Sequence, residues 1–291
     1  MNFKLKSKKT PPPAKTQIIL GRLCNSSTGR ITTAEQKRQK YLRRLREMSS
    51  EHTTTKKMLE KLHGNLNYVA GIEPYGRPFL AHLTNAISGS RYDEEVILPF
   101  VARRALLVWE RILTLNKGSS MEFIIERLPR SRSDIFVDAS SSWGIGGCCG
   151  KYFFAISLAS LKAMQVHVDI IARLELLAAL VSILCFGDLM RRKLVYLHID
   201  NDNAYNWLRK SRSSNLQGTR YLALWELMKY KLECKVSPFW IPSDANRTAD
   251  TLSRGTIPSW LKRRGIRRRL SRTDARLLRK CPIKTWLENV I

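Results

Sequence analysis

The sequence is short of acidic side chains. It has 24 Asp and Glu against 51 Lys and Arg, which gives a formal net charge of +27 over 291 residues. An excess of this size is unusual for an ordinary soluble enzyme and favours a polyanionic partner, of which nucleic acid is the obvious one. Residues 1–60 carry 15 basic and 4 acidic side chains, and residues 251–291 carry 12 and 2. We expect these flanks to contact phosphates; the alternative is that they only solubilise the ends of the chain.

The sequence also lacks the patterns of a zinc site, a disulfide framework and a membrane anchor. None of its six cysteines stands in a Cys-x-x-Cys spacing, which indicates a reducing compartment. No apolar run is long enough to cross a membrane, and the Lys-rich start has no apolar stretch like that of a secretory signal. We therefore expect a nuclear or cytoplasmic protein with no membrane partner.

Composition divides the chain into four segments. Residues 1–32 are rich in Lys, Pro and Ser and are expected to form a flexible basic arm. Residues 33–132 are rich in helix-forming residues and are expected to be mostly helical. Residues 133–255 have the sequence patterns of an α/β domain, and residues 256–291 are expected to form a basic C-terminal tail.

The α/β segment is recognised from its alternating strand and helix patterns. Short β-rich runs come first, and long apolar runs at helical spacing follow. In chain order we expect strands over 134–139, 143–149 and 152–158, a helix over 170–190, a strand over 194–200, helices over 204–210 and 216–233, a strand over 235–241, and a helix over 243–252. This order predicts a layered α/β domain.

Acidic residues at the ends of these elements are conspicuous in so basic a chain. Asp138 and Asp200 end predicted strands, Glu175 lies among leucines on the apolar helix, and Asp250 lies on the last helix. A carboxylate on an apolar helix is costly to bury unless it is paired, hydrogen-bonded or bound to a metal. Each acid also has an ordinary alternative, namely Asp138 in a turn, Asp200 as a helix cap, and Asp250 paired with Arg247 or Arg254. Taken together, the four favour a metal site.

Four carboxylates at one place repel each other unless cations lie among them. Mg²⁺ suits this role because it prefers hard oxygen ligands, and Mn²⁺ can take its place. Two such ions roughly 3.5–4 Å apart activate a water and stabilise the leaving oxygen of a phosphodiester. The pattern therefore predicts hydrolysis of a nucleic-acid backbone.

A series of short segments carries a resemblance to a known family. The segments are Val137-Asp138-Ala139-Ser140 with Trp143-Gly144-Ile145-Gly146-Gly147, then Leu174-Glu175-Leu176-Leu177-Ala178, then Ile199-Asp200-Asn201, then Trp240-Ile241-Pro242-Ser243 with Asn246, Ala249-Asp250 and Leu252-Ser253-Arg254. The series resembles the ribonuclease H domain of retroelement reverse transcriptases, most closely that of DIRS-type elements. The stretch from Leu62 to Leu80 is similar to the thumb and connection region that precedes the domain in these polymerases.

This resemblance implies a ribonuclease H-like mixed five-stranded sheet with flanking helices, preceded by a mostly helical thumb/connection-like region. It also implies that the catalytic residues, which hold two Mg²⁺ ions, are Asp138, Glu175, Asp200 and Asp250. The implied activity is that of a ribonuclease H-like hydrolase, an endonuclease that cuts the RNA strand of RNA·DNA hybrids. The alternative is a domesticated, non-catalytic nucleic-acid-binding or assembly protein that uses the fold as a scaffold.

The chain departs from the polymerases in the motif of the palm. No Tyr-x-Asp-Asp motif of a polymerase palm is present. We therefore expect a fragment of a retroelement polymerase that does not synthesise DNA by itself, with a separate polymerase subunit as a further partner.

Two basic clusters are expected to contact an RNA·DNA hybrid or another duplex. The segment from Lys262 to Leu270 holds six basic residues in nine positions, and a basic helix near residue 43 carries a narrow stripe of leucines. A nuclear-import signal or a solvated helix is the alternative. The expected nucleic-acid-binding residues are Lys262, Arg263, Arg264, Arg267, Arg268, Arg269, Arg43 and Arg44.

Other ring side chains are expected to belong to the core. His198 lies two residues before Asp200, and we interpret it as a packed histidine, with a place beside the metal site as the alternative. The tryptophans assigned to the core are Trp207, Trp225 and Trp240.

Overall fold

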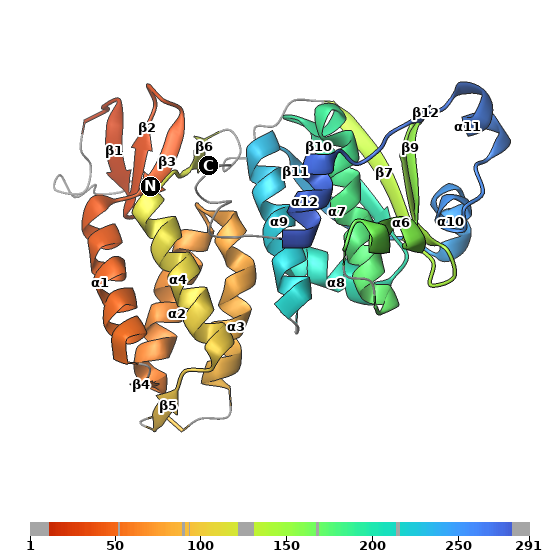
Figure 1. Ribbon diagram of the computed structural model, residues 1–291. Coiled ribbons are helices and arrows are strands. Elements are labelled where there is room, and N and C mark those ends of the chain that lie inside the picture. Colours follow the sequence, from red (N-terminus) through yellow and green to blue (C-terminus); the bar gives the residue numbers. More distant parts are fainter. Residues whose placement is uncertain are drawn as a thin grey trace, which may run out of the picture.

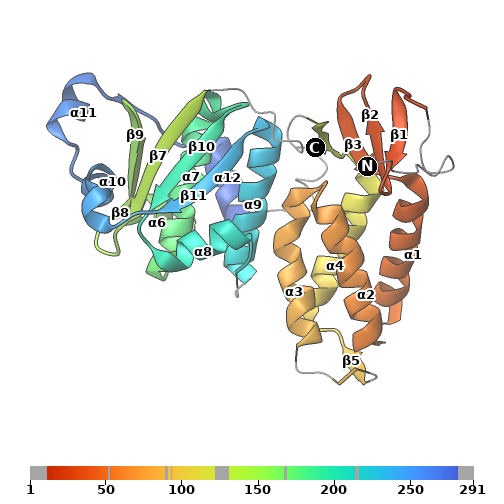
Figure 2. The ribbon, with the colours of Figure 1, turned by 180° about the vertical axis from the view of Figure 1, so that it is seen from behind.

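A computed structural model of the protein describes residues 12–51, 53–88, 91–92, 94–121, 131–166, 169–213 and 216–280. Two parts lie side by side in both views of Figures 1 and 2. The N-terminal part has a small sheet at one end of a group of helices, and the C-terminal part has a larger sheet covered by helices. Within the described ranges, no helix combines the length and the apolar character needed to cross a membrane.

The N-terminal sheet differs from the flexible arm expected for residues 1–32. Its strands lie in the order β1-β2-β3-β6, with bounds Thr16–Ile19, Arg22–Asn25, Arg30–Thr33 and Ser119–Ser120. Gly21 and Gly29 adopt φ values of 78° and 62° in the turns between the first three strands, and this backbone freedom permits tight hairpins that composition does not signal. Residues 1–11, with the first Lys-rich stretch, lie outside the described residues.

The next region is mostly helical, as expected. It contains α1 (Glu35–Glu51), α2 (Lys56–Ala70), the short helix η2 (Pro74–Gly76), α3 (Arg77–Ile87) and α4 (Phe100–Leu115), with a two-stranded pair formed by β4 (Thr53–Thr55) and β5 (Glu95–Ile97). The apolar stripe of the basic helix α1 is buried by Tyr41, Leu42, Leu45 and Met48. Because α1 packs against α4 and α2, this stripe is covered by the protein's own helices.

The larger sheet has the strand order β11-β10-β7-β8-β9-β12. Its strands are β7 (Arg132–Ala139), β8 (Gly144–Cys149), β9 (Tyr152–Ser157), β10 (Leu194–Ile199), β11 (Lys235–Trp240) and β12 (Ile266–Arg267). The pairs β7-β8 and β8-β9 are antiparallel, and β10 runs parallel to both β7 and β11. The predicted ribonuclease H-like mixed sheet with flanking helices is therefore confirmed. The expected number of strands was too low by one, because β12 is a two-residue strand that extends the β9 edge.

Helices cover both faces of this sheet. They are α6 (Leu158–Ala163), α7 (Ile171–Met190), α8 (Asp202–Lys210), α9 (Leu216–Leu232), α10 (Arg247–Ser253), α11 (Ser259–Arg264) and α12 (Arg272–Lys280), with the short helix η3 (Ser243–Ala245) before α10. The apolar helix α7 packs on β7 and β8 and also against α9, so it is buried almost all round. Gly146 of β8 faces α10, since a Cβ there would lie 2.5 Å from the backbone nitrogen of Ser253. Figures 1 and 2 place α10 and α11 at the end of the molecule farthest from α1–α4.

The expected C-terminal tail is folded as far as residue 280. Arg268 pairs with Asp188 of α7 at 2.8 Å and lies over the ring of Tyr152, while Arg267 donates to the backbone oxygen of Ala155. These contacts bring the chain after α11 back to the sheet edge, which a charge count does not reveal. Residues 281–291 lie outside the described residues.

Candidate metal centre

Three acidic side chains meet where β7 and β10 end. The two strands are parallel, with Phe136 beside His198, so Asp138 and Asp200 follow two residues later at the same edge of the sheet. Glu175 approaches this edge from the second turn of α7. One carboxylate oxygen of each of the three acids lies within 4.8 Å of the others. We call Asp138, Glu175 and Asp200 the acidic cluster.

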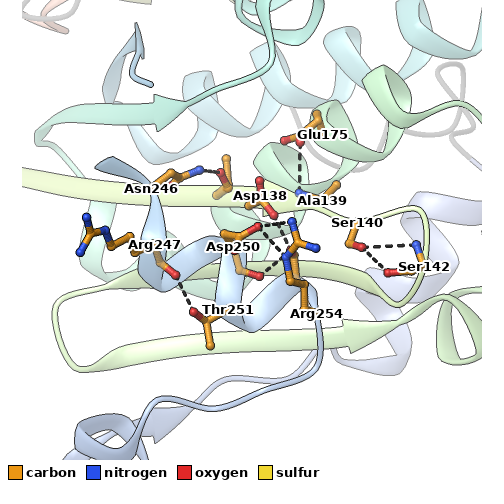
Figure 3. Close-up of polar contacts among 12 residues, drawn as sticks. Asp138, Ala139, Ser140, Ser142, Glu175, Asn246, Arg247, Asp250, Thr251 and Arg254 are labelled. Carbon is orange, nitrogen blue, oxygen red and sulfur yellow. Dashed lines mark hydrogen bonds and ion pairs between the residues drawn. The ribbon is translucent and has the colours of Figure 1, made fainter. Parts of the chain in front are cut away.

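The fourth predicted acid, Asp250, lies beside the acidic cluster but is paired with an arginine. Arg254 approaches a single oxygen of Asp250, Oδ1, with Nη2 at 2.7 Å and Nε at 2.8 Å, as Figure 3 shows. Asp250 is not part of the group of ligand atoms within 4.8 Å, although its charge contributes to raising the pKa of Asp138. Of the two sequence-based interpretations of Asp250, the structure contains the ion pair with Arg254.

Hydrogen bonds from neighbouring elements orient the cluster. The backbone N–H of Ala139 donates to Oε1 of Glu175 at 3.2 Å, and the hydroxyl of the fully buried Ser253 donates to Oδ2 of Asp138. The side-chain amide of Asn246 donates to the carbonyl oxygen of Val137 at 2.9 Å, which ties the start of α10 to β7. These bonds position the ligand oxygens before any ion binds.

Burial makes the ionised form of the cluster costly. Asp138 is 6% exposed and Glu175 is 3% exposed. Loss of solvation raises the pKa of Asp138 to about 6, with further contributions from Asp200 and Asp250. Burial also raises the pKa of Glu175 well above its ordinary value, and Asp138 and Asp200 add to the effect. A bound cation would reverse this balance by favouring the carboxylates.

One oxygen of Glu175 is available as a metal ligand. Oε2 of Glu175 is buried and has no hydrogen-bond partner among the residues that the structure describes. Buried carboxylate oxygens are ordinarily hydrogen-bonded or bound to a metal. The unsatisfied oxygen belongs to the cluster whose ligand atoms have the spacing of a metal site, so the cluster could bind a divalent metal.

The sequence-based assignment of Trp240 to the core is wrong. Its side chain is 48% exposed, and its indole N–H donates to the carbonyl oxygen of Asp200 at 3.1 Å. Trp240 ends β11, an edge strand, which leaves room for an exposed ring. By contrast, Trp225 is buried as expected, and Trp207 is partly buried against the core.

His198 is a packed histidine, as interpreted from the sequence. Its ring stacks on Phe136 with centroids 4.3 Å apart, and its Nε2 lies 2.9 Å from Oδ1 of Asp134. These partners lie further back along β7 from the strand end that carries the acidic cluster. His198 therefore contributes to packing on the sheet and not to the ligand set.

The predicted nucleic-acid-binding residues differ in how exposed their side chains are. Exposed side chains on and after α11 are Lys262, Arg263, Arg264, Arg267 and Arg269, whereas Arg268 is half-buried by its contacts with Asp188 and Tyr152. On α1, Arg43 is exposed at 3.9 Å from Glu47, and Arg44 is half-buried. Of the predicted residues, the group on and after α11 therefore has more exposed side chains than the pair on α1.

Comparison with known proteins supplies a weak likeness to a solved structure and no family assignment. No protein-family model matches the chain, and no curated protein matches it significantly. Among solved structures, the chain is similar to the foamy viral protease-reverse transcriptase dRH in complex with double-stranded DNA, at 12% identity and a TM-score of 0.30. The similarity covers 78% of this chain and 38% of that chain. The assignment of the ribonuclease H-like fold therefore rests on the strand order and not on this likeness.

Proposed function

We propose that the protein is a metal-dependent ribonuclease H-type endonuclease that cuts the RNA strand of RNA·DNA hybrids. The observation that carries the proposal is the acidic cluster at the ends of β7 and β10, with its buried oxygen of Glu175 left without a partner among the described residues. The resemblance of the surrounding motifs to retroelement reverse transcriptases supports the substrate class. Residues 133–255 form the proposed nuclease domain.

Each residue of the site has a separate role in this proposal. Asp138, Glu175 and Asp200 would hold Mg²⁺ or Mn²⁺, with Asp250 as the further ligand for a second ion. When bound, such ions would supply an activated water and would stabilise the leaving oxygen of the phosphodiester. Ser253 holds the carboxylate of Asp138 in place, and Asn246 fixes the helix that carries Asp250 against β7.

Selection of RNA and retention of the duplex depend on different features of the nucleic acid. The wide minor groove and the 2′-hydroxyl of the RNA strand distinguish a hybrid from duplex DNA. The exposed basic residues on and after α11, together with Arg43 and Arg44 of α1, are proposed to contact phosphates, and such contacts carry no base preference.

The test is cleavage of labelled substrates in Mg²⁺. We expect the protein to cut the RNA strand of a hybrid and to leave duplex DNA intact, and we expect Asp138→Asn to abolish cutting. Asp202→Asn is the matched control, because Asp202 is an exposed acid only two residues from Asp200. Absence of hybrid cleavage, or equal cleavage by the Asp138→Asn variant, would end the proposal.

A second candidate is a non-catalytic nucleic-acid-binding protein that uses the same fold as a scaffold. The pairing of Asp250 with Arg254 favours it, because this arginine occupies a carboxylate that a two-ion site requires. In that case binding to duplexes should be tight, salt-dependent and unchanged by Mg²⁺ or by Asp200→Asn. The cleavage assay and this binding assay separate the two candidates.

A further inference from the structure

Arg254 lies beside two of the four acids that a two-ion site would use. Its Nη2 and Nε both approach Oδ1 of Asp250, at 2.7 and 2.8 Å. Its charge also offsets part of the rise in the pKa of Asp138, and the pKa of Arg254 is itself raised first by Asp250 and to a smaller extent by Asp138. The guanidinium therefore acts on the acidic cluster as well as on Asp250.

The backbone on both sides of Arg254 is fixed. Ser253 packs directly on Gly146 of β8, and its hydroxyl donates to Asp138. On the other side, Gly255 has a φ of 81°, and a Cβ there would lie 2.5 Å from the indole ring of Trp143. Since both neighbours of Arg254 are held against the domain, its backbone is fixed one turn from Asp250, and the ion pair with Asp250 places its guanidinium, although the side chain is 63% exposed.

The number of carboxylates limits how many cations the site can hold. Three clustered carboxylates are enough to hold one divalent ion, and a second ion beside them would draw on a further acidic side chain. Asp250 is the acid expected in that role, but it already neutralises a guanidinium. Arginine keeps its charge at any physiological pH, so a second divalent ion at Asp250 has to displace Arg254 or lie next to its positive charge.

We propose that Arg254 restricts the acidic cluster to one tightly bound divalent ion, and that a second ion binds only in competition with this guanidinium for Asp250. The inference rests on the proposed metal site. It holds that the guanidinium of Arg254 takes the position beside Asp250 that a second metal ion would otherwise occupy. It makes Arg254 a residue that sets the metal stoichiometry before substrate arrives.

The experiment is a calorimetric titration of the full chain with Mn²⁺. We expect the unmodified protein to bind one ion tightly and Arg254→Gln to bind two, or to bind the second at least about tenfold more tightly. Arg254→Lys keeps the positive charge and should behave like the unmodified protein. Arg247→Gln is the matched control, because Arg247 is an exposed arginine of the same helix whose Nε donates to the backbone oxygen of Asp244.

The outcomes distinguish this inference from the proposed function. Two ions of equal affinity in the unmodified protein, or an unchanged second site in a folded Arg254→Gln variant, would overturn the role of Arg254 while leaving the metal site intact. Asp138→Asn is titrated in the same way. If it binds Mn²⁺ as well as the unmodified protein does, the metal site and this inference fail together. A second ion gained in Arg254→Gln and lost again when Asp250→Asn is added would assign the competition to Asp250. Thermal melting of each variant checks that it is folded.

Discussion

The hydroxyl group of Ser253 orients the carboxylate of Asp138. It is fully buried and donates to Oδ2 of Asp138. Partners of this kind typically affect metal affinity by 10- to 100-fold, so we expect Ser253→Ala to weaken Mn²⁺ binding by about tenfold or more. Thr251→Ala is the control, since the hydroxyl of Thr251 on the same helix donates only to the carbonyl oxygen of Arg247. Equal affinities for the two variants would contradict the positioning role.

Burial of the Glu175 carboxyl group lowers the stability of the metal-free protein. Its pKa is raised well above the ordinary value because of burial and the neighbouring acids Asp138 and Asp200. Glu175→Gln removes this ionisable group and should stabilise the metal-free protein by about 0.5–2 kcal/mol, as replacements at strained functional positions commonly do. The same change should abolish the rise in melting temperature that Mn²⁺ causes. A variant that is less stable without metal, or still stabilised by Mn²⁺, would argue against this explanation.

Single residues also show what could and what could not be predicted from the sequence. The four acids could be selected because they are unusual at strand ends and on an apolar helix, and three of them meet. Whether Asp250 joins them depends on a choice between a metal ion and Arg254, and the spacing of four residues along a helix permits the ion pair equally well. Trp240 was assigned to the core because it lies in a strand, but its exposure depends on β11 being an edge strand, which is a property of the whole sheet.

Among the elements, α10 depends on a glycine in the strand beneath it. A Cβ at Gly146 would lie 2.5 Å from the nitrogen of Ser253, so Gly146→Ala should displace α10 and destabilise the protein by about 1–3 kcal/mol. At Gly64 of α2, a Cβ would meet nothing within 4 Å, and Gly64→Ala should instead stabilise the helix by about 0.5–1 kcal/mol. Chemical denaturation measures both, and two changes of the same sign would refute the packing argument.

The junction between the two parts of the molecule contains a buried acid, Glu73. It accepts hydrogen bonds from the Tyr75 hydroxyl at 2.5 Å and the Gly118 N–H at 2.6 Å. The Tyr230 hydroxyl of α9 donates to the carbonyl oxygen of the same Gly118. A network centred on Gly118 therefore joins the helical region to the sheet domain.

The pKa of Glu73 gives this junction a pH dependence. Burial raises the pKa above its ordinary value of 4.5, so the folded protein binds this proton more tightly than the unfolded chain does. The free energy of unfolding should fall as pH rises from about 4.5 through the raised pKa. Glu73→Gln should lack this part of the decline, and denaturation of both proteins at a series of pH values measures the difference. A difference that does not vary with pH would contradict the prediction.

The elements that sequence could predict were those with a strong periodic pattern. The strands and helices from β7 to α10 follow from alternating or helical spacing of apolar residues, and their order gave the fold. The strands β1, β2 and β3 have four residues each and β12 has two. Segments so short carry little pattern, and the first three depend on turns at positive φ that only the folded chain displays.

At the scale of the whole molecule, the basic surface should make duplex binding sensitive to salt. The logarithm of the binding constant falls linearly with the logarithm of the salt concentration. Each phosphate that the protein neutralises makes this slope steeper by about 0.9. Replacing the exposed Lys262, Arg263 and Arg264 of α11 by alanine should therefore reduce this slope by about 2–3. The same replacement of Arg272, Arg276 and Arg279 on α12 removes an equal charge elsewhere. Equal losses in the two variants would show that total charge, and not the α11 surface, governs binding.

The function proposed for the whole chain depends on a metal ion bound by Asp138, Glu175 and Asp200, and anomalous diffraction from a crystal soaked in Mn²⁺ is the decisive test. We expect an anomalous peak among the three carboxylates, at about 2.0–2.3 Å from an oxygen of each, as is usual for ions of this class. The absence of a peak there, with Mn²⁺ bound elsewhere or not at all, would refute the metal site.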